Sequence, residues 1–177
     1  PSDWPEHWSS AGFSPLATYT SAVTHELDVD HAYTSGALAR LSSAGISIRD
    51  FDSAQPDAEL RRIYRLAITS FSRNLLYSPI SEDEFLEDSR ALLPLLRPEL
   101  VLLAERDGVP MGFLFGVPDV LGSGDTVIIK TTAVDRDNVT VTLAVRVNTS
   151  QFGAIVAWEA PMQWMAPGDW RLRLLSV

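Results

Sequence analysis

The pair Asp107-Gly108, set between two apolar runs, constrains the fold of this chain more than any other feature. The runs Leu100 to Arg106 and Met111 to Val117 have the length and apolar content of strands, and an Asp-Gly pair between such runs is typical of a tight hairpin. A third strand-like run, Thr126 to Val134, follows directly. The sequence therefore predicts three consecutive strands in an antiparallel meander.

Two helices are predicted before this meander. The segment Pro56 to Ser72 carries apolar residues at the i, i+3, i+4 and i+7 spacing of a helix that is buried on one face. These residues are Leu60, Ile63, Tyr64, Ala67 and Phe71. The run Ser81-Glu82-Asp83-Glu84 is a capping box, which predicts a second helix that reaches about Leu93. The cap and the helix dipole explain the acidity of its first turn better than metal binding does.

The remaining segments are predicted mainly as strands. Phe13 to Val23 and Ile46 to Phe51 are expected to be strands, and Asp28 to Ala44 between them is expected to be a helix that ends at Gly45. After Asn138, the runs VTVTLAVRV, GAIVAW and WRLRLLSV predict further strands. The order from residue 46 is thus strand, helix, helix and three strands, which predicts a mixed α/β fold with a mostly antiparallel sheet flanked by helices.

Composition excludes several classes of function. The chain has 177 residues, enough for one domain, and a net charge of −9, which argues against a nucleic-acid partner because no basic surface is available. It has no cysteine, and all 3 histidines lie at or before His31, so neither a zinc site nor a Ser-His-Asp triad is expected later in the chain. No apolar run is long enough to span a membrane. We therefore expect a cytoplasmic protein that holds no metal and binds neither nucleic acid nor membrane.

The order of these elements, together with four stretches of sequence, resembles the N-terminal half of a GNAT (GCN5-related) N-acetyltransferase domain. Leu60 to Phe71 with NLLYSPISEDEF resembles the family's first helix pair and substrate-side loop. LVLLAERDGVPMGFLFGVPD resembles its second and third strands, and TVIIKTTAV resembles its fourth. GFSPLATYTS, near the start of the chain, resembles the strands that close such a domain.

This resemblance implies a GNAT-like acyl-CoA N-acyltransferase fold and a division of the chain at residue 45. Residues 46–177 are expected to form a GNAT-like domain whose C-terminal part is strand-rich and departs from the family. Residues 1–45 are expected to be an N-terminal extension or the tail of a preceding GNAT-like copy.

The resemblance also implies where a cofactor would lie. In the family, the fourth strand splays from its neighbour and contacts acetyl-CoA through backbone groups, which implies contacts from Thr132, Ala133 and Val134. The family pattern Q/R-x-x-G-x-G/A follows, and its amides cradle the pyrophosphate. With this pattern begun at Val139, Thr142 occupies the glycine position and Ala144 the G/A position, so these two residues would also contact the cofactor. A β-branched residue at the glycine position hinders close approach of a phosphate.

Acyl transfer to an amine also needs a base, and a carboxylate usually serves. By position in the resemblance, the catalytic candidates are Glu105 and Asp119. Glu105 has the alternative of a solvated charge beside the hairpin, and Asp119 that of an ordinary turn residue. Tyr77, in the loop before the second helix, either lines the acceptor pocket or is simply packed.

The resemblance as a whole implies an N-acetyltransferase that moves acetyl from acetyl-CoA to a small-molecule amine. The alternative is a catalytically inactive GNAT-like domain that acts as a binding or regulatory module, which the missing glycine favours. A third interpretation is a strand-rich interaction protein whose likeness to the family is superficial. The apolar segment that contains Trp158, Trp164 and Trp170 is expected to be core or the contact of a homodimer.

Overall fold

A computed structural model of the chain describes residues 3–16, 20–24, 31–74, 76–121, 126–135, 145–147, 154–159 and 174–176. Its α-helices are α1 (Trp4–Ser10), α2 (His31–Ser43), α3 (Pro56–Phe71) and α4 (Glu82–Leu92). Two short 3₁₀ helices, η1 (Leu93–Leu95) and η2 (Pro98–Leu100), follow α4. Its strands are β1 (Thr20–Thr24), β2 (Ile46–Asp50), β3 (Val101–Arg106), β4 (Val109–Pro118), β5 (Thr126–Val134), β6 (Val145–Val147), β7 (Ala154–Glu159) and β8 (Leu174–Ser176).

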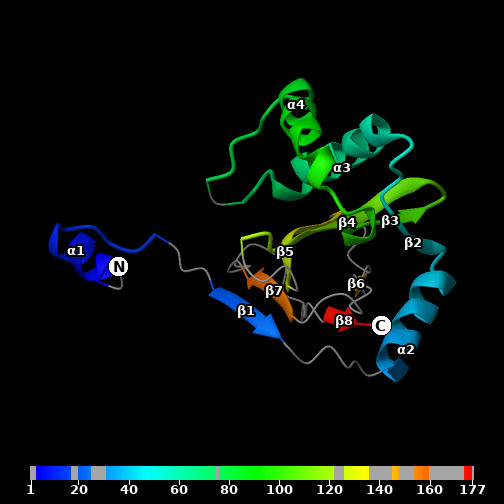
Figure 1. Cartoon of the computed structure of the whole chain (residues 1–177), viewed down its shortest axis with the longest axis horizontal. Helices are drawn as coiled ribbons and strands as arrows, with labels where there is room; N and C mark the ends of the chain where they lie inside the picture. The colour runs from blue at the N-terminus through cyan, green and yellow to red at the C-terminus, as the bar shows by residue number, and fades with distance from the viewer. Residues whose placement is uncertain are drawn as a thin grey trace.

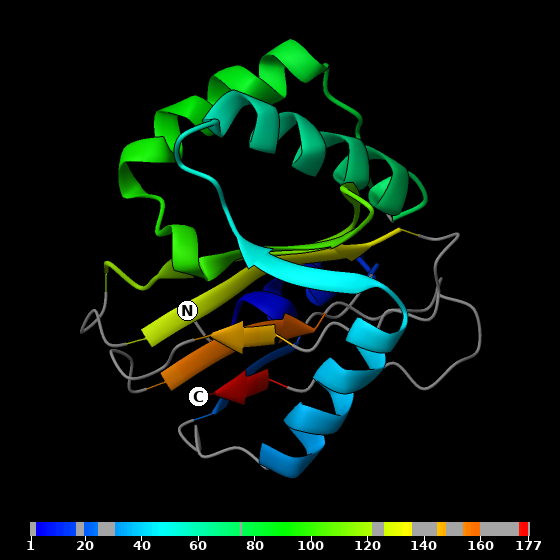
Figure 2. The ribbon, with the colours of Figure 1, turned by 90° about the vertical axis from the view of Figure 1, so that its right-hand side faces the viewer.

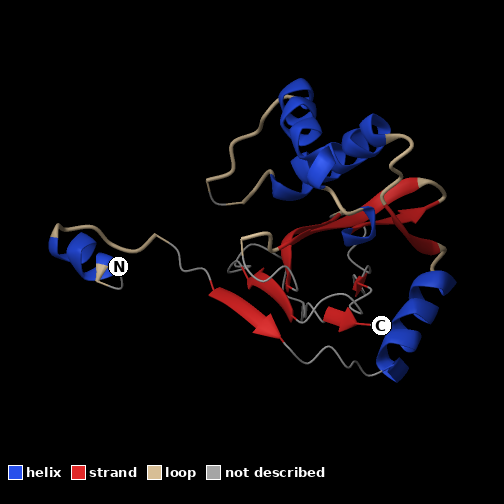
Figure 3. Cartoon of the chain, viewed as in Figure 1, coloured by secondary structure: helices blue, strands red, loops and turns tan. Residues whose placement is uncertain are grey.

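Most of the strands form one large sheet. It has 6 strands in the order β1-β7-β5-β4-β3-β2, while β6 and β8 pair in a second sheet. All neighbours in the large sheet are antiparallel except β5 and β7, which are parallel. Helices α3 and α4 lie over one face of this sheet and α2 lies on the opposite side (Figure 1 and Figure 2). The arrangement, seen by element type in Figure 3, confirms the predicted mixed α/β fold with a mostly antiparallel sheet.

The predicted hairpin joins β3 and β4 as the sequence indicated. Asp107 has a φ of 52° and Gly108 a φ of 75°, and the flanking residues Arg106 and Val109 are paired. Positive φ at both central residues is the backbone of the tight turn that an Asp-Gly pair favours. The prediction of three consecutive antiparallel strands, β3 to β5, is therefore confirmed.

Helices α3 and α4 cover the sheet as their sequence patterns predict. The apolar face of α3 packs on β3 and β4 through a core of side chains that include Leu60, Ile63, Leu103 and Phe113. Ser81 is the N-cap of α4, and its hydroxyl accepts a hydrogen bond from the Glu84 N–H at 3.2 Å. The N-cap of the predicted capping box is thus confirmed, and it starts α4 where its apolar residues can reach the same core.

The N-terminal part differs from its prediction. A strand was expected over Phe13 to Val23, but residues 13–16 are not in a strand, and the described strand is Thr20–Thr24. Pro15 has no N–H to donate to a neighbouring strand, and the Phe13 ring packs edge-on against Trp8 of α1, with 5.0 Å between the ring centroids. Helix α1 was not predicted; it lies apart from the sheet and buries none of its residues (Figure 1).

Strand β1 pairs with β7 and so belongs to the same sheet as β2 to β5. The division of the chain at residue 45 stays a prediction. Helix α2 ends just before Gly45, whose φ of 70° suits the end of a helix, as expected. None of the described helices has the length and apolar character that crossing a membrane would take.

Candidate functional site

The pairing between β5 and β7 stops partway along both strands. The last residue pair is Ile129 opposite Ala157. β5 continues to Val134, whereas the remaining residues of β7 pair with β1 alone. Within the described ranges, the second half of β5 therefore has β4 on one side and no strand on the other.

A β-bulge lies at the point where this pairing stops. Phe115 of β4 stands opposite Thr131, and the next residue, Gly116, stands opposite Ile129, so Lys130 is the extra residue of β5. A bulge bends its strand and increases the local twist. The bulge therefore coincides with the end of the β5–β7 pairing.

The free edge of β5 carries main-chain groups of known direction. The Asp135 N–H donates to the Met111 carbonyl at 2.7 Å, which makes this pair a hydrogen-bonded one. Hydrogen-bonded pairs alternate along an antiparallel ladder, so Ala133 also directs its N–H and C=O toward β4. Thr132 and Val134 direct theirs the opposite way, to the side away from β4.

One of these outward groups has a partner on α3. The Ser70 hydroxyl donates to the Val134 carbonyl at 3.0 Å. This bond places the C-terminal end of α3 beside the free edge of β5. The Thr132 N–H and C=O are the pair of outward main-chain groups nearest the bulge, and they suit a ligand that offers both an acceptor and a donor.

The structure does not bring the predicted catalytic carboxylates to this edge. The Asp119 N–H donates to the Thr126 carbonyl at 2.8 Å, and its side chain accepts from the Leu121 N–H at 3.2 Å. Asp119 therefore lies in a turn at the opposite end of β5, roughly 20 Å from Thr132 at about 3.3 Å per residue. Glu105 lies two strands from β5, or about 10 Å at the usual strand spacing.

Glu105 is not the solvated hairpin charge that was considered for it, because it is only 8% exposed. Its carboxylate accepts hydrogen bonds from Arg49 Nε at 2.9 Å and from Arg49 Nη2 at 2.7 Å. Arg49 also binds Glu59 of α3, through Nη1 at 2.6 Å and Nη2 at 3.0 Å. The Arg49 guanidinium thus joins β2, β3 and the first turns of α3.

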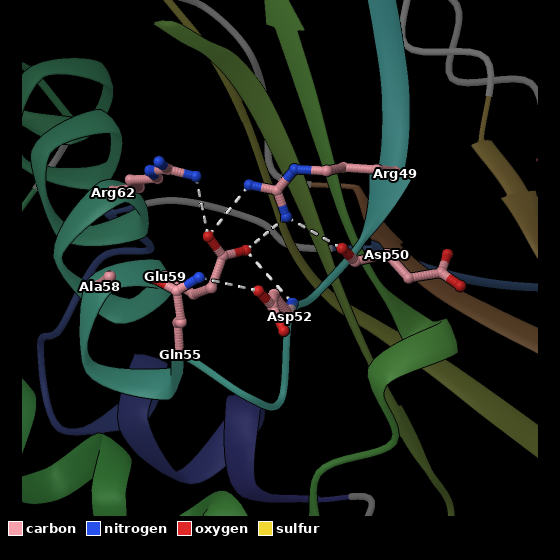
Figure 4. Close-up of a pocket in the computed structure, with 7 residues that line it drawn as sticks. All are labelled: Arg49, Asp50, Asp52, Gln55, Ala58, Glu59 and Arg62. Carbon is pink, nitrogen blue, oxygen red and sulfur yellow. Dashed lines mark hydrogen bonds and ion pairs between the residues drawn. The ribbon is translucent and has the colours of Figure 1, made fainter. Parts of the chain in front are cut away.

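Arg62 completes this ion cluster, which we define as Arg49, Glu59, Arg62 and Glu105. Its Nη1 lies 3.0 Å from Glu59 Oε1 and 3.3 Å from Glu105 Oε1. Figure 4 shows both arginines directed at the Glu59 carboxylate. A pocket of about 340 Å³ lies beside the cluster. Its lining residues are Arg49, Asp50, Asp52, Gln55, Ala58, Glu59 and Arg62.

The charges of the cluster stabilise one another. Burial acts to raise the pKa of Glu59, but the hydrogen bonds from Arg49 and from the Asp52 N–H, with the charges of Arg49 and Arg62, outweigh it and hold that pKa below its usual value. Hydrogen bonds to Glu59 and then to Glu105 raise the pKa of Arg49. The ionised forms of Arg49 and Glu59 are therefore favoured, and the cluster fastens α3 to the edge of the sheet.

Sequence reasoning missed this cluster, although one signal pointed to it. Glu59 lies next to Leu60 and four residues before Ile63, on the face of α3 that is otherwise apolar. A carboxylate on a buried face needs a charged partner. Arg49, ten residues earlier in the chain, supplies it.

The other predicted residues are placed as follows. Tyr77 is half-buried in the loop that follows α3, where its N–H donates to the Asn74 carbonyl at 3.1 Å. Thr142, Ala144, Trp164 and Trp170 lie outside the described residues, and Trp158 is in β7. In the part of the chain that the structure describes, no group of His, Cys, Asp or Glu side chains is arranged to hold a metal ion.

A strand, two helices and three antiparallel strands form the order that the resemblance to the GNAT family implies, and the last strand pairs with a parallel neighbour over only part of its length. The described part of the chain therefore has a GNAT-like acyl-CoA N-acyltransferase fold, with the free edge of β5 as its candidate site.

Several solved structures are similar to this chain. A GCN5-related N-acetyltransferase from Sphaerobacter thermophilus is 16% identical, with a TM-score of 0.47, over 94% of this chain and 60% of that one. A GNAT family acetyltransferase from Brucella melitensis in complex with acetyl-CoA is 24% identical, with a TM-score of 0.36, over 51% and 55%. The ribosomal-protein-S18-alanine N-acetyltransferase from Escherichia coli is 16% identical, with a TM-score of 0.34, over 52% and 48%.

These similarities are loose, since each of the TM-scores lies below 0.5, and the topology described above carries the assignment of the fold. The chain spans 28% to 60% of the length of six solved structures that it matches. No family model matches the sequence, and no curated protein matches it.

Proposed function

We propose that this chain is an N-acyltransferase of the GNAT type, which transfers acetyl from acetyl-CoA to a small-molecule amine at the free edge of β5. The observation that carries the proposal is the end of β5–β7 pairing at Ile129, beyond which Thr132 directs its main-chain groups away from β4. A thioester that lies along this edge can accept a hydrogen bond from the Thr132 N–H.

In the proposed reaction, the amine nitrogen attacks the thioester carbonyl carbon. Negative charge develops on the carbonyl oxygen, and the Thr132 N–H stabilises it. The carbon–sulfur bond then breaks, the CoA thiolate leaves and takes a proton from solvent, and the amine nitrogen loses its proton. Val134 and Ala133 hold the edge in place, and Tyr77, Thr142 and Ala144 remain proposed contacts for the acceptor and the cofactor.

Neither of the two predicted carboxylates is placed to accept the proton of the amine. Glu105 is engaged by Arg49 and Arg62, and Asp119 by its own turn. We therefore infer that the acceptor enters as a neutral amine, or loses its proton to water. The logarithm of kcat/KM should then rise with pH until the pKa of the acceptor itself is reached.

A binding experiment with a matched pair of variants tests the proposal. Acetyl-CoA at a hundredfold excess over its Kd should raise the unfolding free energy by about 2.7 kcal/mol. Thr132→Pro removes the outward N–H without touching the ladder to β4 and should lower kcat by roughly 10²- to 10³-fold. Thr132→Val keeps the N–H and should retain most of the activity. Absence of a thermal shift in the wild type at millimolar acetyl-CoA would refute the proposal.

A catalytically inactive, acyl-CoA-binding module is the second candidate, and the engagement of both Glu105 and Asp119 favours it. It predicts a thermal shift with acetyl-CoA and no acetylated product on a panel of amines. The same titration, followed by mass spectrometry of the amines, separates the two candidates.

We also propose a homodimer through the apolar segment that contains Trp158, Trp164 and Trp170. Sedimentation of the wild type over a range of concentrations tests it.

A further inference from the structure

The hydroxyl side chains near the C-terminal end of α3 behave differently from one another. Thr69 donates to the Arg65 carbonyl at 2.9 Å, and Ser72 donates to the Thr69 carbonyl at 3.0 Å, so both bond within their own segment. Ser70 instead donates to the Val134 carbonyl of β5 at 3.0 Å, 64 residues away in sequence. Serine in a helix commonly bonds back to its own backbone, so this bond across elements calls for an explanation.

The explanation lies in the ladder of β5. Among the described residues, β5 beyond Ile129 is paired with β4 alone, and the bulge at Lys130 lies where the pairing with β7 ends. Val134 directs its carbonyl to the side opposite β4. The half-buried Ser70 hydroxyl supplies a donor at this position, where the adjacent strand would otherwise supply one.

We propose that Ser70 is a positioning residue, which holds the free edge of β5 against α3 and so fixes the direction of the Thr132 N–H. Thr132 and Val134 are two residues apart and face the same edge, so a bond at Val134 limits the rotation of the strand that carries both. The expected effect of Ser70 on acyl-CoA binding rests on the proposed function. The hydrogen bond from Ser70 to Val134, which we call the tether, is present in the ligand-free protein and can be measured there.

Hydrogen exchange in the ligand-free protein is the first measurement. The Ala133 and Asp135 amides bond to β4 next to the tether, whereas the Leu114 amide bonds toward β3 and serves as the internal reference. Ser70→Ala should accelerate exchange at Ala133 and Asp135 by roughly 2- to 10-fold, the loss expected for one neutral hydrogen bond, and leave Leu114 unchanged.

Two further variants give this measurement its controls. Ser72→Ala removes a hydroxyl of the same kind, two residues away, that bonds within α3, so it should leave the β5 amides unaffected. Ser70→Thr keeps a hydroxyl at position 70 and should restore exchange toward the wild-type rate. Equal exchange at Ala133 and Asp135 in Ser70→Ala and Ser72→Ala would overturn the tether.

Acetyl-CoA affinity is the second measurement. Ser70→Ala should weaken the Kd for acetyl-CoA by roughly 2- to 10-fold, and Ser70→Thr should recover it. If exchange is faster but the Kd is unchanged, the positioning role is overturned while the proposed function stands. If the wild type does not bind acetyl-CoA, the proposed function fails, and the exchange data alone then support or overturn the tether.

Discussion

Removal of the Arg49 guanidinium should destabilise this protein more than removal of any exposed arginine. Arg49→Met keeps the aliphatic packing of the side chain but takes away the hydrogen bonds to Glu59, which is 2% exposed, and to Glu105, which is 8% exposed. Loss of one partner of a buried ion pair costs about 3–5 kcal/mol. Arg62 stays within hydrogen-bond distance of both carboxylates, so we expect the lower end, about 3 kcal/mol.

Urea and thermal unfolding measure this loss. For a chain of this size, about 3 kcal/mol corresponds to a Tm lowered by roughly 6–12 °C. Arg90→Met is the matched control, because Arg90 makes a bidentate ion pair with Asp57, at 2.9 and 2.7 Å. Unlike the carboxylates of the cluster, these two side chains are 47% and 46% exposed. Solvent screens that pair, so the control should leave the unfolding free energy almost unchanged.

The dependence on pH gives a second, independent readout. The pKa of Glu59 is lowered in the folded wild type, so its stabilising contribution is present above the unfolded value of about 4.3 and is lost as the pH falls through the folded value. In Arg49→Met, burial dominates and should raise the pKa of Glu59 above about 4.3, so the penalty for the ionised carboxylate fades as the pH falls. The difference between wild type and variant should therefore shrink from pH 7 to about pH 4.

Two results would refute this reasoning. One is that Arg49→Met lowers the free energy of unfolding at pH 7 by no more than Arg90→Met does. This would mean that solvent reaches the cluster in the folded protein. The other is a large loss that is the same at pH 7 and at about pH 4. That outcome would assign the effect to packing of the Arg49 side chain rather than to the unpaired carboxylates.

Three further predictions concern the fold and can be checked by the same urea unfolding. Gly116→Ala should lower the free energy of unfolding by about 1–3 kcal/mol, because its Cβ would lie 3.1 Å from the Leu100 carbonyl oxygen. Gly36→Ala is the contrast: the nearest atom to its Cβ would be 3.6 Å away, so the helix propensity of alanine should stabilise α2 by up to about 1 kcal/mol. Ser81→Ala should cost about 1 kcal/mol through loss of the cap on α4. Gly108→Ala should cost about 1–2 kcal/mol, because the φ of 75° disfavours a side chain.

The parts of the fold that the sequence predicts well are those with local causes. Asp107-Gly108 can form its turn whatever surrounds it, and Ser81 caps α4 with a backbone N–H three residues away. The periodicity of α3 is likewise contained within one segment. Such features depend on neighbours in sequence, so the pattern of residue types is enough to locate them.

The interactions that the sequence does not reveal join distant segments. Glu105 and Arg49 are 56 residues apart, and Ser70 and Val134 are 64 residues apart. The sequence offers a charge beside a hairpin and a serine in a helix, and both have ordinary explanations until the sheet order is known. The free edge of β5 was expected from the resemblance to a family, yet the bulge at its start appears only in the pairing with β4.

Helix α3 is held at its two ends by different kinds of bond, and this difference bears on how activity should respond to pH. Glu59, near the start of the helix, is held by ion pairs with Arg49 and Arg62, whereas Ser70, near its end, is held by one neutral hydrogen bond to Val134. The two positions are eleven residues apart, or about 16 Å along a helix. Acid therefore acts first on the end that is remote from β5, where it lowers stability, and the Ser70 bond carries no charge to titrate. A pH dependence of catalysis between about pH 6 and pH 9 should accordingly follow the acceptor amine, because Glu105 is bound by Arg49 and Arg62 and Asp119 lies in a turn at the other end of β5.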